Sequence, residues 1–291
     1  MEPAEPFFKR IAIIGLGLIG GSWALALEKT GYAAQRIGFD APGALKQATE
    51  SGAIHEAATG VDEAVRDADL VILATPVGKI LELLSRVKTA APPRALITDV
   101  GSTKQRIAER AQELPAGGAL FLGGHPLAGK EHSGFEHADS ELFQHACYAV
   151  VPLSEAAMKD ARAKAFVSLI ESLGAQPCVM DAASHDVAMA YLSHLPQLLS
   201  TGLAGMVAER TGQGGMPLQL AGSGFRDLTR LAESPYSMWR DICLTNMENI
   251  QAALDAMIQK LDTIKTHLST RELEKEFDQA RRLRQTLREK D

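Results

Sequence analysis

One histidine stands in a segment whose neighbours would fix its position. Residues 123–131 read GGHPLAGKE, so His125 lies between glycines and Pro126, which together hold a backbone in a defined turn. An imidazole can take up a proton near neutral pH, which is the chemistry of a general base. The segment follows an expected strand, so His125 would lie at the rim of a sheet. We interpret it either as a catalytic base or as a structural histidine.

A glycine-rich segment near the N-terminus is suited to binding a pyrophosphate. Residues 15–20 read GLGLIG, directly after an expected strand and before a run compatible with a helix. In this motif the first glycine permits a tight turn, the second lets the backbone approach the pyrophosphate, and the third lets helix and strand pack closely. The start of the helix adds unpaired N–H groups. The predicted cofactor-binding residues of this turn are Gly15, Gly17, Leu18, Ile19 and Gly20.

An acidic residue and a second strand end complete the predicted cofactor site. Asp40 lies about twenty residues after the glycine turn, where a carboxylate accepts hydrogen bonds from an adenosine ribose. Residues 41–44 contain no arginine that could pair with a 2′-phosphate, so the sequence predicts NAD rather than NADP. Thr75 and Pro76 follow another expected strand at its carboxyl end, the position at which parallel sheets bind their ligands. They are assigned to the same site.

These residues need a parallel sheet to bring them to one edge, and the first half of the chain predicts one. Short apolar runs alternate there with longer amphipathic segments, the pattern of strands joined by crossover helices. Most runs are rich in Ile, Val and Leu without strict alternation, as in strands covered on both faces. The expected strands are 10–14, 36–39, 70–74, 96–99, 120–122, 148–151 and 178–180. The predicted fold class is therefore α/β, with a doubly wound, Rossmann-type sheet.

The last part of the chain has a helical pattern, with expected helices at 184–211, 235–261 and 269–288. We therefore predict an NAD-binding domain over residues 1–181 and an all-helical domain for substrate binding and dimerisation over residues 182–291. The last helix carries an apolar stripe that either packs on its own domain or forms the interface of a homodimer. The stripe consists of Leu273, Phe277, Ala280, Leu283 and Leu287.

The composition argues against several classes of partner. The formal net charge of -6 comes from 36 acidic and 30 basic residues, with no basic block for a nucleic acid. The N-terminus does not resemble a signal peptide, and no apolar run reaches the roughly 18 residues that cross a bilayer. The three cysteines are widely separated, which indicates reduced thiols and a cytoplasmic protein. We expect no nucleic acid and no membrane among the partners.

Several motifs in order give the chain a specific resemblance. The segment GHPLAG at 124–129 resembles the GHPxAG signature of prephenate and arogenate dehydrogenases. The Ser-His-Leu-Pro helix of this family is matched by SHLPQ at 193–197. Its GF(R/K)DxTR and MW segments are matched by GFRDLTR at 224–230 and MWRD at 238–241. The resemblance spans roughly residues 10–260.

The resemblance implies an NAD-dependent prephenate dehydrogenase of tyrosine biosynthesis. Prephenate would be oxidised at C4 and lose carbon dioxide, giving 4-hydroxyphenylpyruvate, with hydride transfer to NAD⁺. His125 would accept the proton of the ring hydroxyl, Ser102 would support that hydroxyl, and His194 would position nicotinamide and substrate. The alternative within the family is an arogenate (cyclohexadienyl) dehydrogenase, which makes tyrosine directly.

By the same resemblance a set of charged residues binds the substrate. Arg230 would hold a carboxylate with its planar fork of donors. Lys104 would add positive potential, and Lys130, which stands where threonine or serine is common, is either a second carboxylate contact or a solvated loop residue. These cations favour dianionic prephenate, whereas Glu131 or Glu136 would receive the ammonium of arogenate. We expect prephenate to be preferred.

Three other functions compete with this interpretation. A metal enzyme would have to use the histidine-rich region 125–145, whose spacings fit no usual zinc pattern, so we expect no metal. A 3-hydroxy-acid dehydrogenase would need a catalytic lysine in its helical domain, yet no lysine occurs between residues 181 and 260. A non-catalytic NAD-sensing module would need neither Arg230 nor the segment GHPLAG. The expected partner is therefore a small-molecule substrate.

Overall fold

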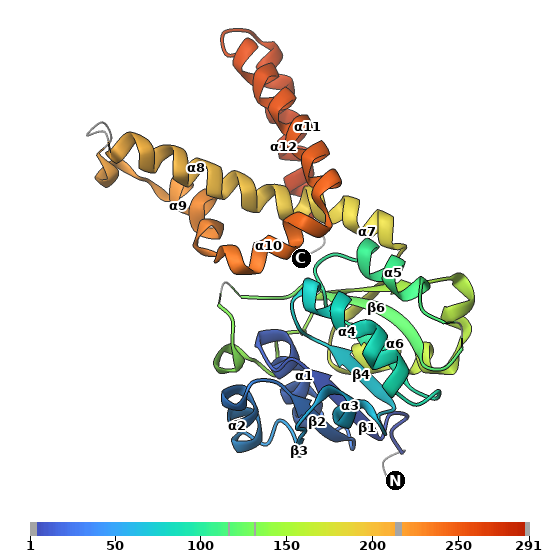
Figure 1. Ribbon diagram of the computed structural model, residues 1–291. Coiled ribbons are helices and arrows are strands. Elements are labelled where there is room, and N and C mark those ends of the chain that lie inside the picture. Colours follow the sequence, from blue (N-terminus) through green and yellow to red (C-terminus); the bar gives the residue numbers. More distant parts are fainter. Residues whose placement is uncertain (1–4, 116, 131, 213–216, 289–291) are drawn as a thin grey trace. The chain divides into compact units, whose positions relative to one another are not determined.

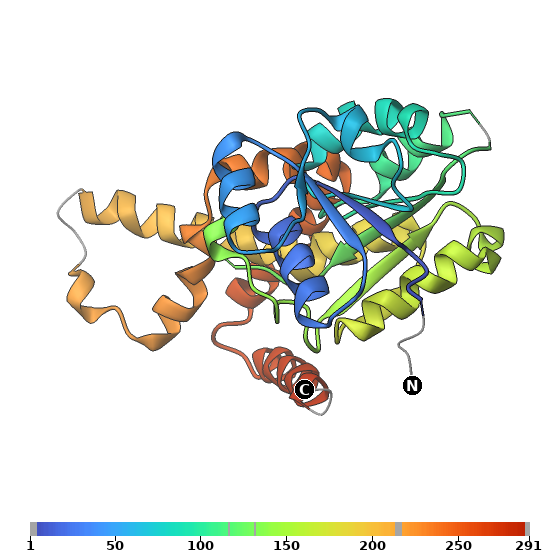
Figure 2. The ribbon, with the colours of Figure 1, turned by 90° about the horizontal axis from the view of Figure 1, so that it is seen from below.

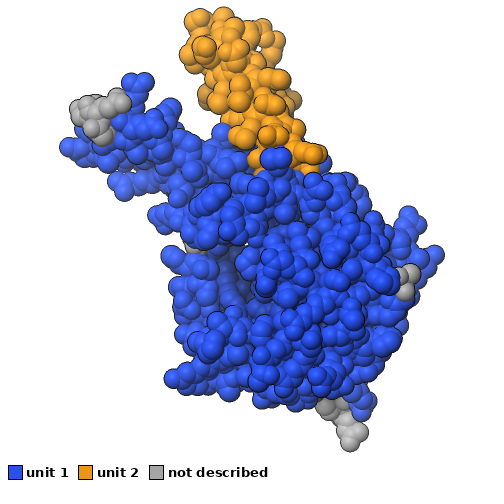
Figure 3. Space-filling model, in the orientation of Figure 1, with its two compact units in different colours: residues 1–247 blue, residues 248–291 orange. Residues whose placement is uncertain are grey.

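The computed structural model describes residues 5–115, 117–130, 132–212 and 217–288, and it divides into two compact units (Figure 3). The first unit, Met1–Met247, contains the sheet and the helices up to α10. The second, Glu248–Asp291, contains α12 (Glu272–Arg288) and nearly all of α11 (Met247–Thr266). The domain boundary predicted between residues 181 and 182 falls inside the first unit, and it stays a prediction.

An eight-stranded sheet forms the centre of the first unit, with the strand order β3-β2-β1-β4-β5-β6-β7-β8. Neighbouring strands are parallel, except β6 and β7, which are antiparallel. The order reverses between β1 and β4, which creates the crevice where ligands of such sheets bind. The predicted doubly wound α/β fold is confirmed. The strands are β1 (Arg10–Ile14), β2 (Gln35–Phe39), β3 (Glu56–Ala57), β4 (Leu70–Leu73), β5 (Leu96–Asp99), β6 (Leu120–Pro126), β7 (Cys147–Pro152) and β8 (Gln176–Val179).

Helices cover both faces of this sheet (Figures 1 and 2). Trp23 and Phe166 belong to the buried apolar cluster on one face, and Ile80 and Ile107 to the cluster on the other. Because apolar helices pack on both faces, the strands read as nearly continuous apolar runs. These helices are α1 (Leu18–Lys29), α2 (Pro42–Glu50), α3 (Val61–Val65), α4 (Val77–Ala90), α5 (Gln105–Gln112) and α6 (Ala161–Ser172).

The ends of two strands differ from the sequence prediction. β6 runs on through His125 to Pro126, because these residues pair with β7, for instance His125 with Ala149. The prediction that His125 follows the strand was therefore wrong, since the residue lies within it. The short β3 is not predicted by the sequence, because Glu56 and Ala57, which pair with β2, form no apolar pattern.

The remainder of the first unit is helical, and both long helices expected there are interrupted. The first is divided by a π-helical turn, because Pro196 has no N–H and its ring would crowd the carbonyl of Leu192 in a continuous helix. The second is divided at Asn246, which ends α10 with a φ of −124°. The observed elements are α7 (Ala182–Met189), the π-helical turn (Ala190–His194), α8 (Leu195–Gly212), α9 (Ser223–Thr229) and α10 (Tyr236–Thr245).

The second unit consists of α11 and α12, which are joined by an ion pair. Lys260 of α11 and Glu276 of α12 lie 2.8 Å apart. Beside them lies a largely apolar pocket of about 600 Å³, and Phe277, which lines it, is 70% exposed. The predicted stripe on α12 is thus largely open on this unit. Within the described ranges, no helix is long and apolar enough to span a membrane.

Candidate active site

The glycine turn lies between β1 and α1, and its shape requires glycine at two positions. Gly15 has a φ of +97°, and its N–H donates to the carbonyl of Phe39 at 2.9 Å. A Cβ on Gly15 would lie 2.6 Å from the carbonyl oxygen of Ala74, and one on Gly20 only 1.9 Å from that of Gly15. Around Gly17, by contrast, the space is open. Bare backbone therefore lines the turn around Gly17, and its contact with a cofactor stays a prediction.

The carboxylate of Asp40 lies across this turn at the end of β2. Its Oδ2 accepts a hydrogen bond from the N–H of Leu16 at 2.5 Å, and its Oδ1 accepts one from Ala41 at 2.6 Å. Leu18 and Ile19 open α1, and the first N–H groups of a helix have no partner within it. Asp40 and the start of α1 thus place an acceptor and several donors on the same side of the sheet.

A pocket of about 440 Å³ lies at this position, which is a volume typical of small-molecule sites. Its two cations are already paired, Arg86 with Asp62 and Lys79 with Glu82, each at 2.7 Å. Thr75 Oγ1 is buried and has no hydrogen-bond partner in the described part of the chain. Pro76, the next residue, precedes α4. The lining residues are Ile14, Gly15, Phe39, Asp40, Ala41, Val61, Thr75, Lys79, Leu83 and Arg86.

His125 is held by a hydrogen-bonded row of side chains that reaches into α7. Its Nδ1 lies 2.9 Å from Nε2 of His185, and Nδ1 of His185 lies 2.8 Å from Oδ1 of Asp186. His185 and Asp186 are fully buried, whereas His125 is partly exposed at the edge of the sheet. His185 and Asp186 were not among the site residues predicted from the sequence. The signal for them is slight: an adjacent His-Asp pair at the start of the helical segment that ends in His194.

His194 belongs to the same cluster. Its Nδ1 lies 3.2 Å from Nδ2 of Asn246, which also donates to the backbone carbonyl of Asp186 at 2.7 Å. The ring meets that of Trp239 edge to face, with centroids 5.9 Å apart. Burial lowers the pKa of His194 to about 4. Burial also lowers the pKa of His125 well below its ordinary value, so both imidazoles are neutral near pH 7.

The resemblance implied that Lys104 adds positive potential at the site, but its side chain is buried next to Gly124 of β6. Its ammonium pairs with Asp99 and donates to the carbonyl of Gly124 at 2.7 Å. Its side chain is only 1% exposed. Asp99 also accepts a hydrogen bond from the N–H of Gly124 at 3.3 Å. The Lys104–Asp99 pair therefore fixes the strand segment directly before His125, and the charge of the lysine is compensated locally.

Two carboxylates from the helices beyond residue 181 bind the starts of α5 and α4. Asp186 accepts hydrogen bonds from the N–H groups of Lys104 at 2.7 Å and Gln105 at 2.9 Å. Asp241 of α10 accepts one from Gly78 at 2.9 Å. These N–H groups carry the positive end of the helix dipole and lack partners in their own helices. The carboxyl ends of β4 and β5 are thus attached, through α4 and α5, to the helices beyond residue 181 at two points.

Ser102 and Arg230 lie on two different segments. Ser102 is half-buried in the loop between β5 and α5, two residues before Lys104. Arg230 is exposed and opens a short 3₁₀ turn, Arg230–Glu233, directly after α9. The carbonyl of Leu231 in that turn accepts a hydrogen bond from Gln197 of α8 at 2.8 Å. The turn that carries Arg230 is thereby tied to the helix that follows His194.

The loop after β6 holds the remaining predicted residues. Lys130 is exposed, and its Nζ lies 3.1 Å from Oδ2 of Asp139 and 3.3 Å from the carbonyl of His137. Glu131 lies outside the described residues. The rings of His132 and His137 stack with centroids 4.9 Å apart. Among the residues that the structure describes, no three His, Cys, Asp or Glu side chains are grouped to hold a metal ion.

Two family models together match most of the chain. The model described as "Prephenate dehydrogenase, nucleotide-binding domain" matches residues 23–185. The model described as "Prephenate dehydrogenase, dimerization domain" matches residues 181–289. The two matches meet close to the position at which the sequence changes from an alternating to a helical pattern.

Individual relatives are similar over nearly the whole length. A prephenate dehydrogenase of Lactococcus lactis subsp. cremoris is 34% identical over 284 residues, which are 96% of this chain and 77% of that protein. The structure of a prephenate dehydrogenase from A. aeolicus in complex with hydroxyphenyl propionate and NAD⁺ has a TM-score of 0.86 and 28% identity, covering 97% of this chain and 98% of that one. The structure of Synechocystis arogenate dehydrogenase has a TM-score of 0.80 and 32% identity, covering 96% and 99%.

Proposed function

Because the chain belongs to the prephenate dehydrogenase family of NAD-dependent oxidoreductases, we propose that it converts prephenate and NAD⁺ to 4-hydroxyphenylpyruvate, carbon dioxide and NADH. The observation that carries the proposal is His125, a neutral imidazole presented by β6 at the same edge of the sheet as the glycine turn. The parallel strands β1, β4, β5 and β6 end at that edge, where ligands of such sheets bind.

The residues around the glycine turn fit the cofactor. The open space at Gly17 and the start of α1 suit a pyrophosphate, and the orphaned hydroxyl of Thr75 offers a further hydrogen bond. Asp40 would accept from the ribose hydroxyls. A 2′-phosphate would meet the carboxylate of Asp40 and find Lys79 and Arg86 already paired, so NAD is favoured over NADP. When bound, NAD⁺ supplies the acceptor for the hydride that leaves C4.

The imidazole of His125 would act as the base. Because burial lowers its pKa, the ring stays unprotonated at neutral pH and can accept the proton of the C4 hydroxyl. Loss of carbon dioxide then makes the ring aromatic, and the proton returns to the oxygen, which becomes a phenol. Ser102 would support the hydroxyl, and His194, whose ring meets Trp239 edge to face, would position nicotinamide and substrate.

The choice between prephenate and arogenate depends on charge near the side-chain end of the substrate. Lys104 is compensated by Asp99, so the expected preference for prephenate rests on Arg230 and on Lys130, whose charge Asp139 partly offsets. Arg230 would bind a carboxylate in a bidentate fashion. Glu131 or the exposed Glu136 would favour the ammonium of arogenate. We therefore propose prephenate as the better substrate and arogenate as the alternative.

The experiment is a steady-state comparison of both substrates with NAD⁺, using the whole chain and two variants. Replacing His125 by Asn should lower kcat by about 10²- to 10⁴-fold with nearly unchanged NAD affinity. Replacing Arg230 by Ala should raise KM, at a cost of about 2–3 kcal/mol, whereas Ala at the neighbouring exposed Arg226 should not. A higher kcat/KM for arogenate would reverse the substrate assignment. NAD binding without turnover of either substrate would indicate a sensing module.

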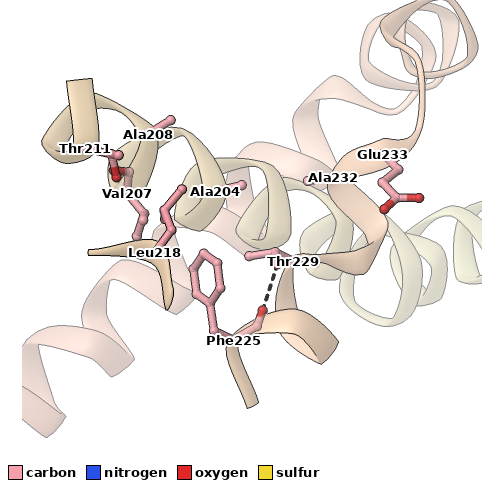
Figure 4. A pocket seen from close by; sticks show the side chains of 9 residues that line it. All are labelled: Ala204, Val207, Ala208, Thr211, Leu218, Phe225, Thr229, Ala232 and Glu233. Atoms are coloured by element: carbon pink, nitrogen blue, oxygen red, sulfur yellow. Dashed lines mark hydrogen bonds between the residues drawn. The ribbon is translucent and has the colours of Figure 1, made fainter. Parts of the chain in front are cut away.

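We further propose that the protein is a homodimer that works in the cytoplasm. Many large apolar side chains beyond residue 181 are exposed, among them Leu192 at 75% and Leu220 at 80%. An open apolar pocket of about 510 Å³ lies in this region, and Figure 4 shows Phe225, Leu218 and Val207 of α8 among the side chains that line it. A second copy would cover such surfaces. The three cysteines are free thiols, in keeping with a reducing compartment.

Light scattering at micromolar concentration tests the dimer. The chain should have twice the mass of one copy, and Glu in place of the exposed Phe277 should weaken the assembly by placing a charge in an apolar surface. Glu in place of Thr263, which is exposed on α11 and outside the apolar pocket there, is the matched control. A monomer at all concentrations would rule out the dimer.

A further inference from the structure

We propose that His185 and Asp186 are positioning residues that hold His125 in the tautomer whose Nε2 is free to take the substrate proton. They also share the positive charge that this proton brings. The identity of the proton donor rests on the proposed function, but the tautomer does not. Neither residue stands out in the sequence, and their role follows from the order of donors and acceptors in the buried row.

The order begins at the carboxylate of Asp186, which can only accept hydrogen bonds when ionised. Nδ1 of His185, 2.8 Å away, must therefore carry a hydrogen. A neutral His185 then has a bare Nε2, which accepts from the atom 2.9 Å away, Nδ1 of His125. His125 consequently has its hydrogen on Nδ1 and a lone pair on Nε2. A carboxylate that orients a histidine in this way is a known device of general-base catalysis.

Hydrogen-bond donors surround both carboxyl oxygens of Asp186. Its Oδ1 accepts from the N–H of Lys104 as well as from His185, and its Oδ2 accepts from Gln105. The N-terminus of α5 adds the positive end of the helix dipole. Since donors point at both oxygens, a carboxyl proton would have to displace one of them. Asp186 thus remains an acceptor, and the direction of the row is set.

The charged and titratable groups around His125 and His185 oppose protonation of His125 by solvent. Lys104 lies below β6, where Asp99 compensates it, and His194 faces the row from the π-helical turn. Burial lowers the pKa of His125, and the nearby ammonium of Lys104 lowers it further. The base therefore stays neutral until a proton donor is bound next to it. His185 and Asp186 are both fully buried, so the row does not continue to water at that end.

The hydrogen-bonded side chains do not lead a proton to water at the Asp186 end, and this matches the proton balance of the reaction. The O–H bond at C4 breaks and an N–H bond forms at Nε2 of His125, while hydride leaves C4 for the nicotinamide. The C–C bond to the departing carboxylate then breaks, its electron pair enters the ring, and the proton returns to the oxygen. No net proton is produced. His125 needs only to store one proton, and His185 with Asp186 can stabilise the resulting imidazolium by polarising toward it.

Nitrogen NMR on histidine-labelled, cofactor-free protein tests the tautomer directly, because it distinguishes protonated from bare ring nitrogens. Near pH 7, His125 and His185 should both be protonated at Nδ1 and bare at Nε2. Signals are assigned from the variants His125→Asn and His185→Gln, with His267→Gln as a control in the other compact unit. A proton on Nε2 of His125 would overturn the proposal, whatever the substrate of the enzyme proves to be.

Two substitutions at one position separate positioning from packing. His185→Gln keeps an acceptor for Nδ1 of His125 and should retain kcat within about tenfold, whereas His185→Leu should lose about 10²- to 10³-fold, with little change in NAD affinity. The Leu variant should also shift His125 toward the other tautomer in the NMR spectrum. Equal losses in both variants with native NAD binding, or full activity in the Leu variant, would contradict the positioning role. If the tautomers are as expected but prephenate is not turned over, the proposed function fails and the positioning inference stands.

Discussion

Replacing His194 by Asn should make the protein less sensitive to acid. Burial lowers the pKa of His194 to about 4, against a smaller opposing effect of Asp186, whereas the unfolded chain should titrate near the ordinary value of 6.5. As the pH falls below 6.5, the unfolded state binds a proton that the folded state refuses, so stability is lost down to about pH 4. Asparagine does not titrate, and its carbonyl oxygen can replace Nδ1 as the acceptor from Asn246.

The size of the effect follows from the two pKa values of His194. A folded-state pKa of about 4 against 6.5 corresponds to about 3 kcal/mol in full, of which about 2 kcal/mol is lost between pH 7 and pH 4.5. Urea unfolding at several pH values and one protein concentration measures this loss. The free energy of unfolding should fall by about 2 kcal/mol more in the wild type than in the variant.

A control variant separates His194 from histidines in general. His267, partly exposed and hydrogen-bonded to Thr270 at 3.2 Å, can be replaced by Asn in the second unit and should leave the pH dependence of the first unit unchanged. Parallel stability curves for the wild type and the His194 variant would refute the reasoning, because the histidine would then bind its proton equally in both states.

Three further experiments test the cofactor turn, the attachment of α4 and the choice of cofactor. Gly20→Ala should destabilise the chain by about 3 kcal/mol and weaken NAD binding, since its Cβ would lie 1.9 Å from a backbone oxygen; unaltered urea unfolding would contradict this. Gly78→Ala would bring a Cβ within 2.9 Å of Asp241 Oδ2, so its cost, about 1–3 kcal/mol, should shrink when Asp241→Ala is added, and an additive double-mutant cycle would exclude the contact. Asp40→Ser combined with Ala41→Arg should shift the ratio of kcat/KM values toward NADP, whereas an unchanged ratio would mean that the ribose is recognised elsewhere.

Local sequence patterns predicted the glycine turn and most strands of the sheet. The turn around Gly15 and Gly20 is encoded by residue types that the backbone requires, because a side chain at either position would collide with a carbonyl. Most strands were recognisable because helices bury them on both faces, whereas β3, which has no apolar pattern, was not. Their ends were less predictable, because β6 extends to Pro126 only through pairing with β7.

The network behind the candidate base could not be predicted in the same way. His125 and His185 are sixty residues apart, and their contact depends on where α7 packs against β7 and α5. A lysine such as Lys104 reads as a surface residue unless its partner Asp99 is known to face it. Residue types therefore indicated the chemistry of the site, whereas tertiary packing decided which side chains meet.

The two carboxylates at the starts of α4 and α5 have a consequence for hydrogen exchange. Amides in the first turn of a helix ordinarily exchange quickly, because they lack partners within the helix. Those of Gly78, Lys104 and Gln105 are instead bound by Asp241 and Asp186. They can exchange only when the helices that carry Asp186 and Asp241 lift away from the sheet. Amides at the starts of α4 and α5 should therefore exchange at a common rate. That rate would measure how often the crevice above the strand ends opens.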